Sequence, residues 1–228
     1  MNTLTIKNLI FGYEAENKIF KGLSLSIEKG ETIGLIGPNG AGKSTFLQLI
    51  LGILKADSGE ISLDGRPLDK KSNGYFRENI GLVFQNPDEQ LFMPSVFDDV
   101  AFGPRNQGLD ELSVTNVVNE TLNHLGIAHL SSRSPAKLSG GEKRCVAIAT
   151  VLAMKPNMII LDEPTLALDP KSRRRVVSLI KSMAVTKVIT SHDMNLIKET
   201  CTRVIILNNG EILADGNPAQ FVLIFVPL

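Results

Sequence analysis

One stretch of this chain decides its fold: Gly37-Pro38-Asn39-Gly40-Ala41-Gly42-Lys43-Ser44-Thr45. It fits the pattern G-x-x-x-x-G-K-[ST] and stands between an apolar run at residues 32–36, which favours a strand, and a run at residues 46–51, which favours a helix. Glycines let consecutive backbone N–H groups of such a loop approach phosphate oxygens, and the start of the helix adds partial positive charge. A glycine-rich turn that contains Lys-Ser by chance is disfavoured by the strand and helix around it. The stretch therefore predicts a site for a nucleoside triphosphate.

All nine residues of this phosphate loop (residues 37–45) are candidate nucleotide-binding residues. Lys43 is expected to reach the β- and γ-phosphates. The Ser44 hydroxyl is expected to bind Mg²⁺, which makes a magnesium nucleotide the predicted ligand.

Four further segments carry polar or small residues directly after an apolar strand-like run or before an apolar helical run. They are Gln85, the signature segment Leu138-Ser139-Gly140-Gly141, the pair Asp162-Glu163, and His192. In this order and spacing, the phosphate loop and these segments resemble the ATP-binding-cassette (ABC) ATPase family. The resemblance runs from about Leu4 to Gly216, and the signature segment is rarely found outside that family. The resemblance to this family implies that the nucleotide is ATP.

The pair Asp162-Glu163 ends a run that reads as a buried strand. This places both carboxylates at the carboxyl edge of the sheet, where open α/β sheets bind ligands. Asp162 can bind Mg²⁺ directly or through water, and Glu163 can polarise the attacking water as a general base. A helix cap or a solvated turn would explain an isolated Asp-Glu pair, but the phosphate loop upstream favours the catalytic interpretation.

The resemblance implies roles for three residues whose chemistry alone is not decisive. His192 corresponds to the switch histidine that contacts the γ-phosphate and helps to hold water and Glu163 in line. Gln85 corresponds to the glutamine that approaches Mg²⁺ and water and carries the nucleotide state toward a membrane partner. Tyr13 matches the aromatic residue that stacks on adenine, a contact that discriminates little between bases. The alternatives are ordinary polar residues after strands for His192 and Gln85, and a strand-edge aromatic for Tyr13.

The signature segment changes the expected mechanism. Ser139, Gly140 and Gly141 at a helix start offer a hydroxyl, bare N–H groups and the helix dipole to an anion. A plain N-capped helix is the alternative. The chain already has a complete phosphate loop, and the resemblance implies that the signature segment serves the nucleotide of another subunit. The expected active unit is therefore a head-to-tail dimer with a second ABC ATPase chain.

Length and composition agree with an α/β protein of this size. The 228 residues suit one large domain or two small ones, and Lys plus Arg equals Asp plus Glu at 24 each, so the charge does not favour a nucleic-acid partner. The two cysteines are too few for a disulfide framework. We expect no signal peptide, and no apolar run approaches the roughly 18 residues of a spanning helix. If this protein moves something across a membrane, it lacks the pore. The family resemblance implies a peripheral location at the cytoplasmic face of the cell membrane.

The fold class expected is α/β, a P-loop NTPase (ABC ATPase) core with a mostly parallel sheet. An antiparallel part near the N-terminus is indicated by Leu23, Leu25 and Ile27, which alternate with polar residues. We expect one ABC ATP-binding domain over residues 3–228. Its parts are a nucleotide core at 3–85 and 156–216, an inserted helical subdomain at 86–155 where strand signals fade, and a short tail at 217–228.

Two segments, residues 84–92 and 99–106, indicate which branch of the ABC ATPase family the chain resembles. They look like the ATPase subunits of energy-coupling-factor importers. This resemblance implies that the partners are integral-membrane coupling and substrate-binding subunits. It also implies that the cargo is cobalt or nickel, with biotin or another vitamin as the alternative. A soluble ABC ATPase of DNA repair, chromosome maintenance or translation is the alternative, but no sustained heptads of an inserted coiled coil occur. An inactive regulatory cassette is opposed by the intact catalytic residues.

Three features depart from the family pattern or stay open. Leu166 stands where many relatives carry Ser or Ala, which puts fine contacts across the dimer in doubt, and Cys145 stands where a basic residue commonly follows the signature. The chain ends in an apolar stretch at residues 221–228, either a contact surface or an oddity of the coding sequence. Four apolar residues of the predicted helical subdomain have two possible roles: they offer a groove to a partner helix, or they pack the subdomain itself. They are Leu91, Phe92, Val96 and Phe97.

Overall fold

The apolar run before the phosphate loop forms β3 (Thr32–Ile36), a fully buried strand inside a six-stranded sheet. The sheet has the order β10-β9-β3-β8-β7-β6, with β3 and β6 to β9 parallel and β10 antiparallel to β9. Its other strands are β6 (Ile80–Val83), β7 (Met158–Asp162), β8 (Thr186–Thr190), β9 (Arg203–Asn208) and β10 (Glu211–Gly216). Buried central strands of this kind need cover on both faces of the sheet.

A second, antiparallel sheet covers one face. Its order is β2-β1-β4-β5, formed by β1 (Asn2–Phe11), β2 (Phe20–Glu28), β4 (Ser58–Leu63) and β5 (Arg66–Pro67). In β2, buried Leu23, Leu25 and Ile27 alternate with exposed or half-exposed residues, which confirms the half-buried strand expected there. Helices α1 (Lys43–Ile50) and α2 (Asn73–Asn79) complete this apolar core, in which the rings of Phe20 and Phe46 meet edge to face.

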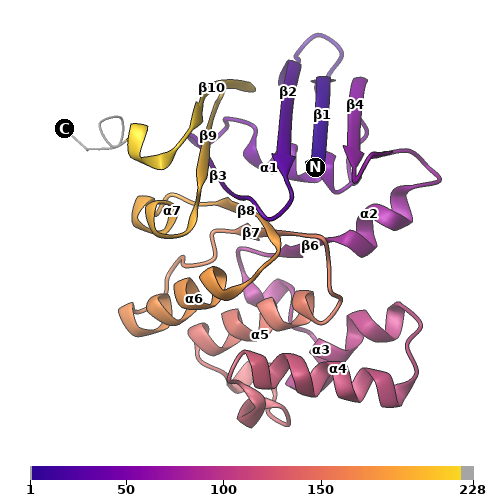
Figure 1. The fold of residues 1–228 in the computed structure, drawn as a ribbon, viewed down its shortest axis with the longest axis vertical. Helices are drawn as coiled ribbons and strands as arrows, with labels where there is room; N and C mark the ends of the chain where they lie inside the picture. Colours follow the sequence, from indigo (N-terminus) through magenta and orange to yellow (C-terminus); the bar gives the residue numbers. More distant parts are fainter. Residues whose placement is uncertain (1, 222–228) are drawn as a thin grey trace.

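Helices cover the other face. They are α3 (Val96–Asn106), α4 (Glu111–His124), α5 (Gly140–Leu152), α6 (Pro170–Ser182) and α7 (Met194–Thr200). Their apolar sides join a second core with the strand residues Val83, Ile159 and Ile189. Figure 1 shows α3, α4 and α5 gathered at the end of the molecule opposite β1, β2 and β4.

The segment between β6 and β7 consists of helices and the loops that join them. Residues 86–155, all of which the structure describes, contain three α-helices, the short 3-10 helices η1 (Pro87–Glu89), η2 (Ala128–Leu130) and η3 (Pro135–Lys137), and no strand. Side-chain caps start the helices: Ser95 accepts a hydrogen bond from the Asp98 N–H, and Asp110 accepts from the N–H groups of Leu112 and Ser113. Such caps satisfy donors that the first turn of a helix leaves unpaired.

The structure, a computed structural model, describes residues 2–221. The final 3-10 helix, η4 (Pro218–Phe221), ends this range, so most of the apolar C-terminal stretch lies outside the described residues. No described helix combines the length and the apolar character needed to span a bilayer. The expected fold class, a mostly parallel α/β core with an antiparallel N-terminal sheet and added helices, is confirmed.

Candidate nucleotide-binding site

The phosphate loop connects the carboxyl end of β3 to the first turn of α1. A Cβ on Gly37 would lie 2.0 Å from the carbonyl oxygen of Leu207, so only glycine fits at the start of the loop. Gly42, the N-cap of α1, has φ of 101°, a left-handed conformation that side chains with a Cβ rarely adopt. Glycine is thus required at both ends of the loop for different reasons. Gly37 is packed too closely for a Cβ, and Gly42 adopts a left-handed backbone conformation.

Lys43 lies across the loop. Its Nζ donates hydrogen bonds to the carbonyl oxygens of Gly37 at 2.7 Å and Pro38 at 3.0 Å. Burial lowers the pKa of Lys43, while the carboxylates of Glu163 and Asp162 act in the opposite direction. An ammonium group has three donors, so one remains beyond the two that the loop uses.

A cleft of about 600 Å³ opens beside the loop and brings most of the predicted site residues together. Its lining consists of Ile19, Asn39, Gly40, Gly42, Lys43, Ser44, Thr45, Gln85, Asp162, Glu163, Leu166 and His192. Gly37, Pro38 and Ala41 belong to the loop but do not line the cleft. Four sequence segments that are far apart in the chain therefore meet at the carboxyl edge of the large sheet.

Glu163 is held by the end of the neighbouring strand. Its Oε1 accepts a 2.8 Å hydrogen bond from the backbone N–H of His192, and its Oε2 accepts a 3.0 Å bond from the hydroxyl of Ser191. Its own N–H donates to the carbonyl of Thr190 at 2.9 Å, and its φ is +44°. A residue other than glycine in this left-handed region stores strain, which folded proteins concentrate at functional sites. Ser191 was not among the predicted site residues, although it directly precedes His192 after the same strand.

Asp162 and His192 flank this carboxylate on different elements. Asp162 ends β7 directly beside Thr190 of β8, and its Oδ1 accepts a short hydrogen bond from the Thr190 hydroxyl. The His192 imidazole has 61% of its side chain exposed, with Nε2 3.7 Å from Oε1 of Glu163. One carboxylate is therefore fixed within the sheet, whereas the imidazole is free to contact a ligand in the cleft.

Tyr13 lies outside the cleft lining but beside the start of α1. Its ring is 64% exposed and meets Phe11 edge to face at 5.2 Å. Its hydroxyl lies 3.4 Å from Oγ1 of Thr45. An exposed ring next to the phosphate loop has a face available for stacking, and its role toward adenine stays a prediction.

The signature segment lies apart from this cleft. Ser139 caps α5 in a capping box: its Oγ accepts from the Glu142 N–H, and the Glu142 carboxylate accepts from the Ser139 N–H at 2.8 Å. The Ser139 N–H and the Ser139 hydroxyl both donate to the Glu142 carboxylate, and these two bonds lower the pKa of Glu142. Gly141 packs on α6, where a Cβ would lie 2.3 Å from Oγ of Ser172, whereas the nearest atom to a Cβ on Gly140 would be 4.0 Å away. The N-capped helix expected as an alternative is thus present, with Ser139 and Gly140 exposed.

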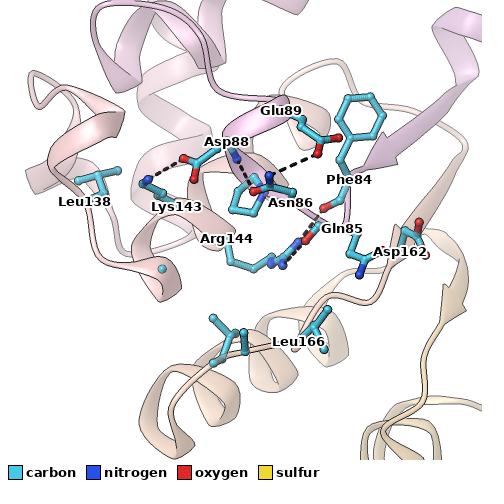
Figure 2. Close-up of a pocket in the computed structure, with 14 residues that line it drawn as sticks. Phe84, Gln85, Asn86, Asp88, Glu89, Leu138, Lys143, Arg144, Asp162 and Leu166 are labelled. Atoms are coloured by element: carbon cyan, nitrogen blue, oxygen red, sulfur yellow. Dashed lines mark hydrogen bonds and ion pairs between the residues drawn. The ribbon is translucent and has the colours of Figure 1, made fainter.

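A second cavity of about 660 Å³ adjoins the cleft and shares Gln85, Asp162 and Leu166 with it. Figure 2 shows two basic residues of α5 that reach across this cavity to the segment after β6. Lys143 pairs with Asp88 at 2.6 Å, and Arg144 donates to the carbonyl oxygens of Phe84 and Gln85, each at 2.7 Å. Neither basic residue was among the predicted site residues. Cys145, which stands at the position usually basic in the family, is buried in the helical core.

A third cavity of about 490 Å³ also borders the segment after β6, and its lining mixes aromatic, aliphatic and polar residues. Phe92 and Phe102 meet edge to face at 5.1 Å and are 63% and 41% exposed. Leu91 and Val96, in contrast, are buried in the core, and Phe97 packs against it. Of the four residues offered together as a groove, three therefore pack the helical subdomain core, and only Phe92 is exposed at the surface.

Asp99 is a buried residue in the lining of that third cavity. It is 3% exposed, and its Oδ1 accepts from the N–H groups of Phe92 and Met93 at 3.0 and 3.1 Å. Burial raises the pKa of Asp99, and these two hydrogen bonds oppose the shift. The Asp99 carboxyl thus fixes the backbone that presents Phe92 at the surface.

Comparisons with known proteins place the chain among relatives of one kind. The family model for ABC transporters matches residues 20–166. A putative ABC transporter ATP-binding protein of Geobacter sulfurreducens is 44% identical over 92% of this chain and 85% of its own length. The energy-coupling factor transporter ATP-binding protein EcfA of Methanothermobacter thermautotrophicus is 42% identical over 95% of this chain and 71% of its own length.

Solved structures give the same result. cbiO1 from Clostridium perfringens, part of the ABC transporter complex cbiONQ, superposes with a TM-score of 0.90 and 38% identity, covering 97% of this chain and 91% of that one. A nucleotide-free ATP-binding cassette from an ABC transporter superposes with a TM-score of 0.84 and 27% identity, covering 98% and 95%.

Proposed function

The chain belongs to the ABC transporter family as an ATP-hydrolysing subunit, and from this premise we propose that it powers an energy-coupling-factor importer of cobalt or nickel ions. The observation that carries the ATPase part is the position of Glu163, held by Ser191 and His192 within the cleft that the phosphate loop lines. The likeness to cbiO1 supports the importer type. We further propose that residues 3–228 form one ATP-binding domain, with residues 86–155 as its helical subdomain and 217–228 as a tail.

The cleft residues fit ATP with Mg²⁺. The Ser44 hydroxyl, the Asp162 carboxylate and the Gln85 amide oxygen all line one cleft, and they are the hard oxygen ligands that Mg²⁺ prefers. The backbone N–H groups of the loop and the Lys43 ammonium would hold the phosphates. When bound, Mg²⁺ neutralises charge that develops on the phosphates during hydrolysis.

In the proposed mechanism, Glu163 accepts a proton from the attacking water. Its carboxylate is already oriented by two donors, so it needs little reorganisation to act as a general base. His192 presents an exposed imidazole beside the same carboxylate, from where it would contact the γ-phosphate. Asp162 stays bound to Thr190 and is positioned for Mg²⁺ rather than for proton transfer.

We propose that two chains complete each site. The signature segment does not line the cleft of its own chain, while Ser139 and Gly140 are exposed at the start of α5. A second ABC ATPase chain, identical or related, would place its signature segment against the bound triphosphate. The helix N-terminus and the bare N–H groups suit that anionic partner.

The partners at the membrane are proposed to be integral coupling and substrate-binding subunits. The third cavity, with exposed Phe92 and Phe102 at its rim, suits the apolar face of a helix from such a subunit. The chain would then act peripherally at the cytoplasmic face of the cell membrane.

Uptake in cells that lack this chain tests the cargo. Accumulation of cobalt or nickel should be lost, restored by the wild-type chain, and not restored by Glu163→Gln. Normal metal uptake together with failed uptake of biotin or another vitamin would overturn the proposed cargo and leave the ATPase mechanism standing.

A further inference from the structure

Arg144 is a buried arginine with an unusual set of partners. It is 2% exposed and forms no ion pair among residues 2–221. Its two terminal nitrogens donate to the backbone carbonyls of Phe84 and Gln85, and its Nε is buried without a hydrogen-bond partner in the described part of the chain. Burying a guanidinium in this way is costly, so the two carbonyl contacts must compensate for lost hydration.

The two carbonyls belong to consecutive residues directly after β6. A guanidinium is planar and presents its donors as a rigid fork, so two bonds to neighbouring carbonyls fix the direction of the backbone between them. That direction decides where the Gln85 side chain leaves the chain. Gln85 lines both the nucleotide cleft and the second cavity, so its backbone is held from one side while its side chain faces the other.

Further contacts from α5 hold the same segment. Lys143 pairs with Asp88, and the Gln90 amide nitrogen donates to the Ala147 carbonyl and the Thr150 hydroxyl, each at 2.8 Å. The amide oxygen of Gln90 accepts from the Phe84 N–H at 3.0 Å. The α5 positions 143, 144, 147 and 150 share one face of the helix, because residues three and four apart are neighbours there. Residues 84–90 are thus bound along two turns of the helix that begins at the signature segment.

We propose that Arg144 is a positioning residue for ATP hydrolysis: it fixes Gln85 in the nucleotide cleft and makes the signature helix and residues 84–90 move as one body. The catalytic consequence rests on the proposed role of Gln85. Since α5 starts at the signature segment, a shift of that helix against a second chain is transmitted to Gln85 through the guanidinium.

The first experiment measures hydrogen exchange of the amides in residues 84–91 in the full chain. Arg144→Lys keeps the charge and removes the fork, and we expect about tenfold faster exchange in this segment, as expected for losing a bond to a charged donor. Arg144→Met removes the charge as well as the fork and should speed exchange at least as much, whereas its control Arg174→Met, at an exposed arginine of α6, should leave exchange in residues 84–91 unchanged. Wild-type exchange in Arg144→Lys would overturn the inference, whatever the ATPase rate.

The second experiment separates positioning from general stability. Arg144→Lys should lower kcat about tenfold with an unchanged Kd for ATP, and adding it to Gln85→Ala should lower kcat no further. Additive losses, or a loss that merely follows the melting temperature across both Arg144 variants, would overturn the catalytic part. An unchanged kcat in Gln85→Ala alone would instead show that the proposed role of Gln85 is wrong, and the exchange measurement would still decide whether Arg144 orders the segment.

Discussion

The backbone N–H of His192 donates a 2.8 Å hydrogen bond to Oε1 of Glu163, while the imidazole of the same histidine lies 3.7 Å from that oxygen. The backbone contact is set by the register of β7 against β8, and it does not depend on the identity of the side chain at position 192. His192 therefore has two separate roles: its backbone N–H orients the Glu163 carboxylate, and its imidazole is available to contact the ligand. Substitution of the side chain removes only the contact with the ligand.

Glu163→Gln should retain ATP affinity and lose most turnover. The amide keeps the shape of the carboxylate but does not accept the proton of water, and general-base help is worth about 10²–10⁴-fold. Lys43→Ala is the contrasting variant, in which binding itself should weaken. Equilibrium binding and steady-state hydrolysis measure the two effects, and wild-type hydrolysis by Glu163→Gln would refute the general-base assignment.

Ser139→Arg should abolish ATP-driven dimerisation and turnover while the single chain still binds nucleotide. The new side chain would extend from the exposed start of α5 into the space proposed for the other chain's triphosphate. Sedimentation with ATP, in the Glu163→Gln background to prevent hydrolysis, measures the dimer. Ser182→Arg, at an exposed residue of α6, is the matched control. Full activity of a highly diluted wild-type monomer would contradict the composite site.

The two signature glycines should respond differently to alanine. Gly141→Ala places a Cβ 2.3 Å from Oγ of Ser172 and should destabilise the fold by about 1–3 kcal/mol. Gly140→Ala meets no atom closer than 4.0 Å and should leave the melting temperature nearly unchanged while it weakens ATP-driven dimerisation. Thermal denaturation and sedimentation separate the two outcomes, and equal stability losses would contradict the packing argument.

The isolated subunit should bind Mg²⁺ only together with nucleotide and should have no tight site for Co²⁺ or Ni²⁺. The proposed magnesium ligands supply one carboxylate and two neutral oxygens, which is a weak set without phosphate oxygens. Soft or imidazole ligands suit the transported metals better, and the chain has three histidines and two cysteines in all. Calorimetric titration with each metal, with and without ATP, checks this, and a tight nickel site on the chain alone would contradict it.

The strands and the phosphate loop could be predicted because their patterns are local. The alternation in β2 and the apolar runs of β3 and β7 appear within a few residues each. Arg144 and Ser191 could not be assigned in that way. Their partners lie 60 and 28 positions away, so only the folded arrangement of α5 and β8 brings them to Phe84 and Glu163.

The division of the apolar segment after Gln85 illustrates the same limit. Leu91 and Phe92 are neighbours of similar hydrophobicity, yet one is buried and the other is 63% exposed. Asp99 accepts hydrogen bonds from the backbone N–H groups of Phe92 and Met93, and these contacts hold the backbone at Phe92. The residue types alone do not predict which of the two side chains is buried.

Strands β6 and β7 are neighbours in the sheet, and the whole helical segment is the crossover that joins them. A parallel pair requires such a connection but sets no upper limit on its size, since the entropy of closing a loop grows only slowly with length. The helical segment that forms this crossover can therefore differ in length without a change in the pairing of β6 with β7, the strand that ends in Asp162. A helical segment transplanted from another cassette would need a basic side chain in the position of Arg144, to donate hydrogen bonds to the carbonyl oxygens of residues 84 and 85.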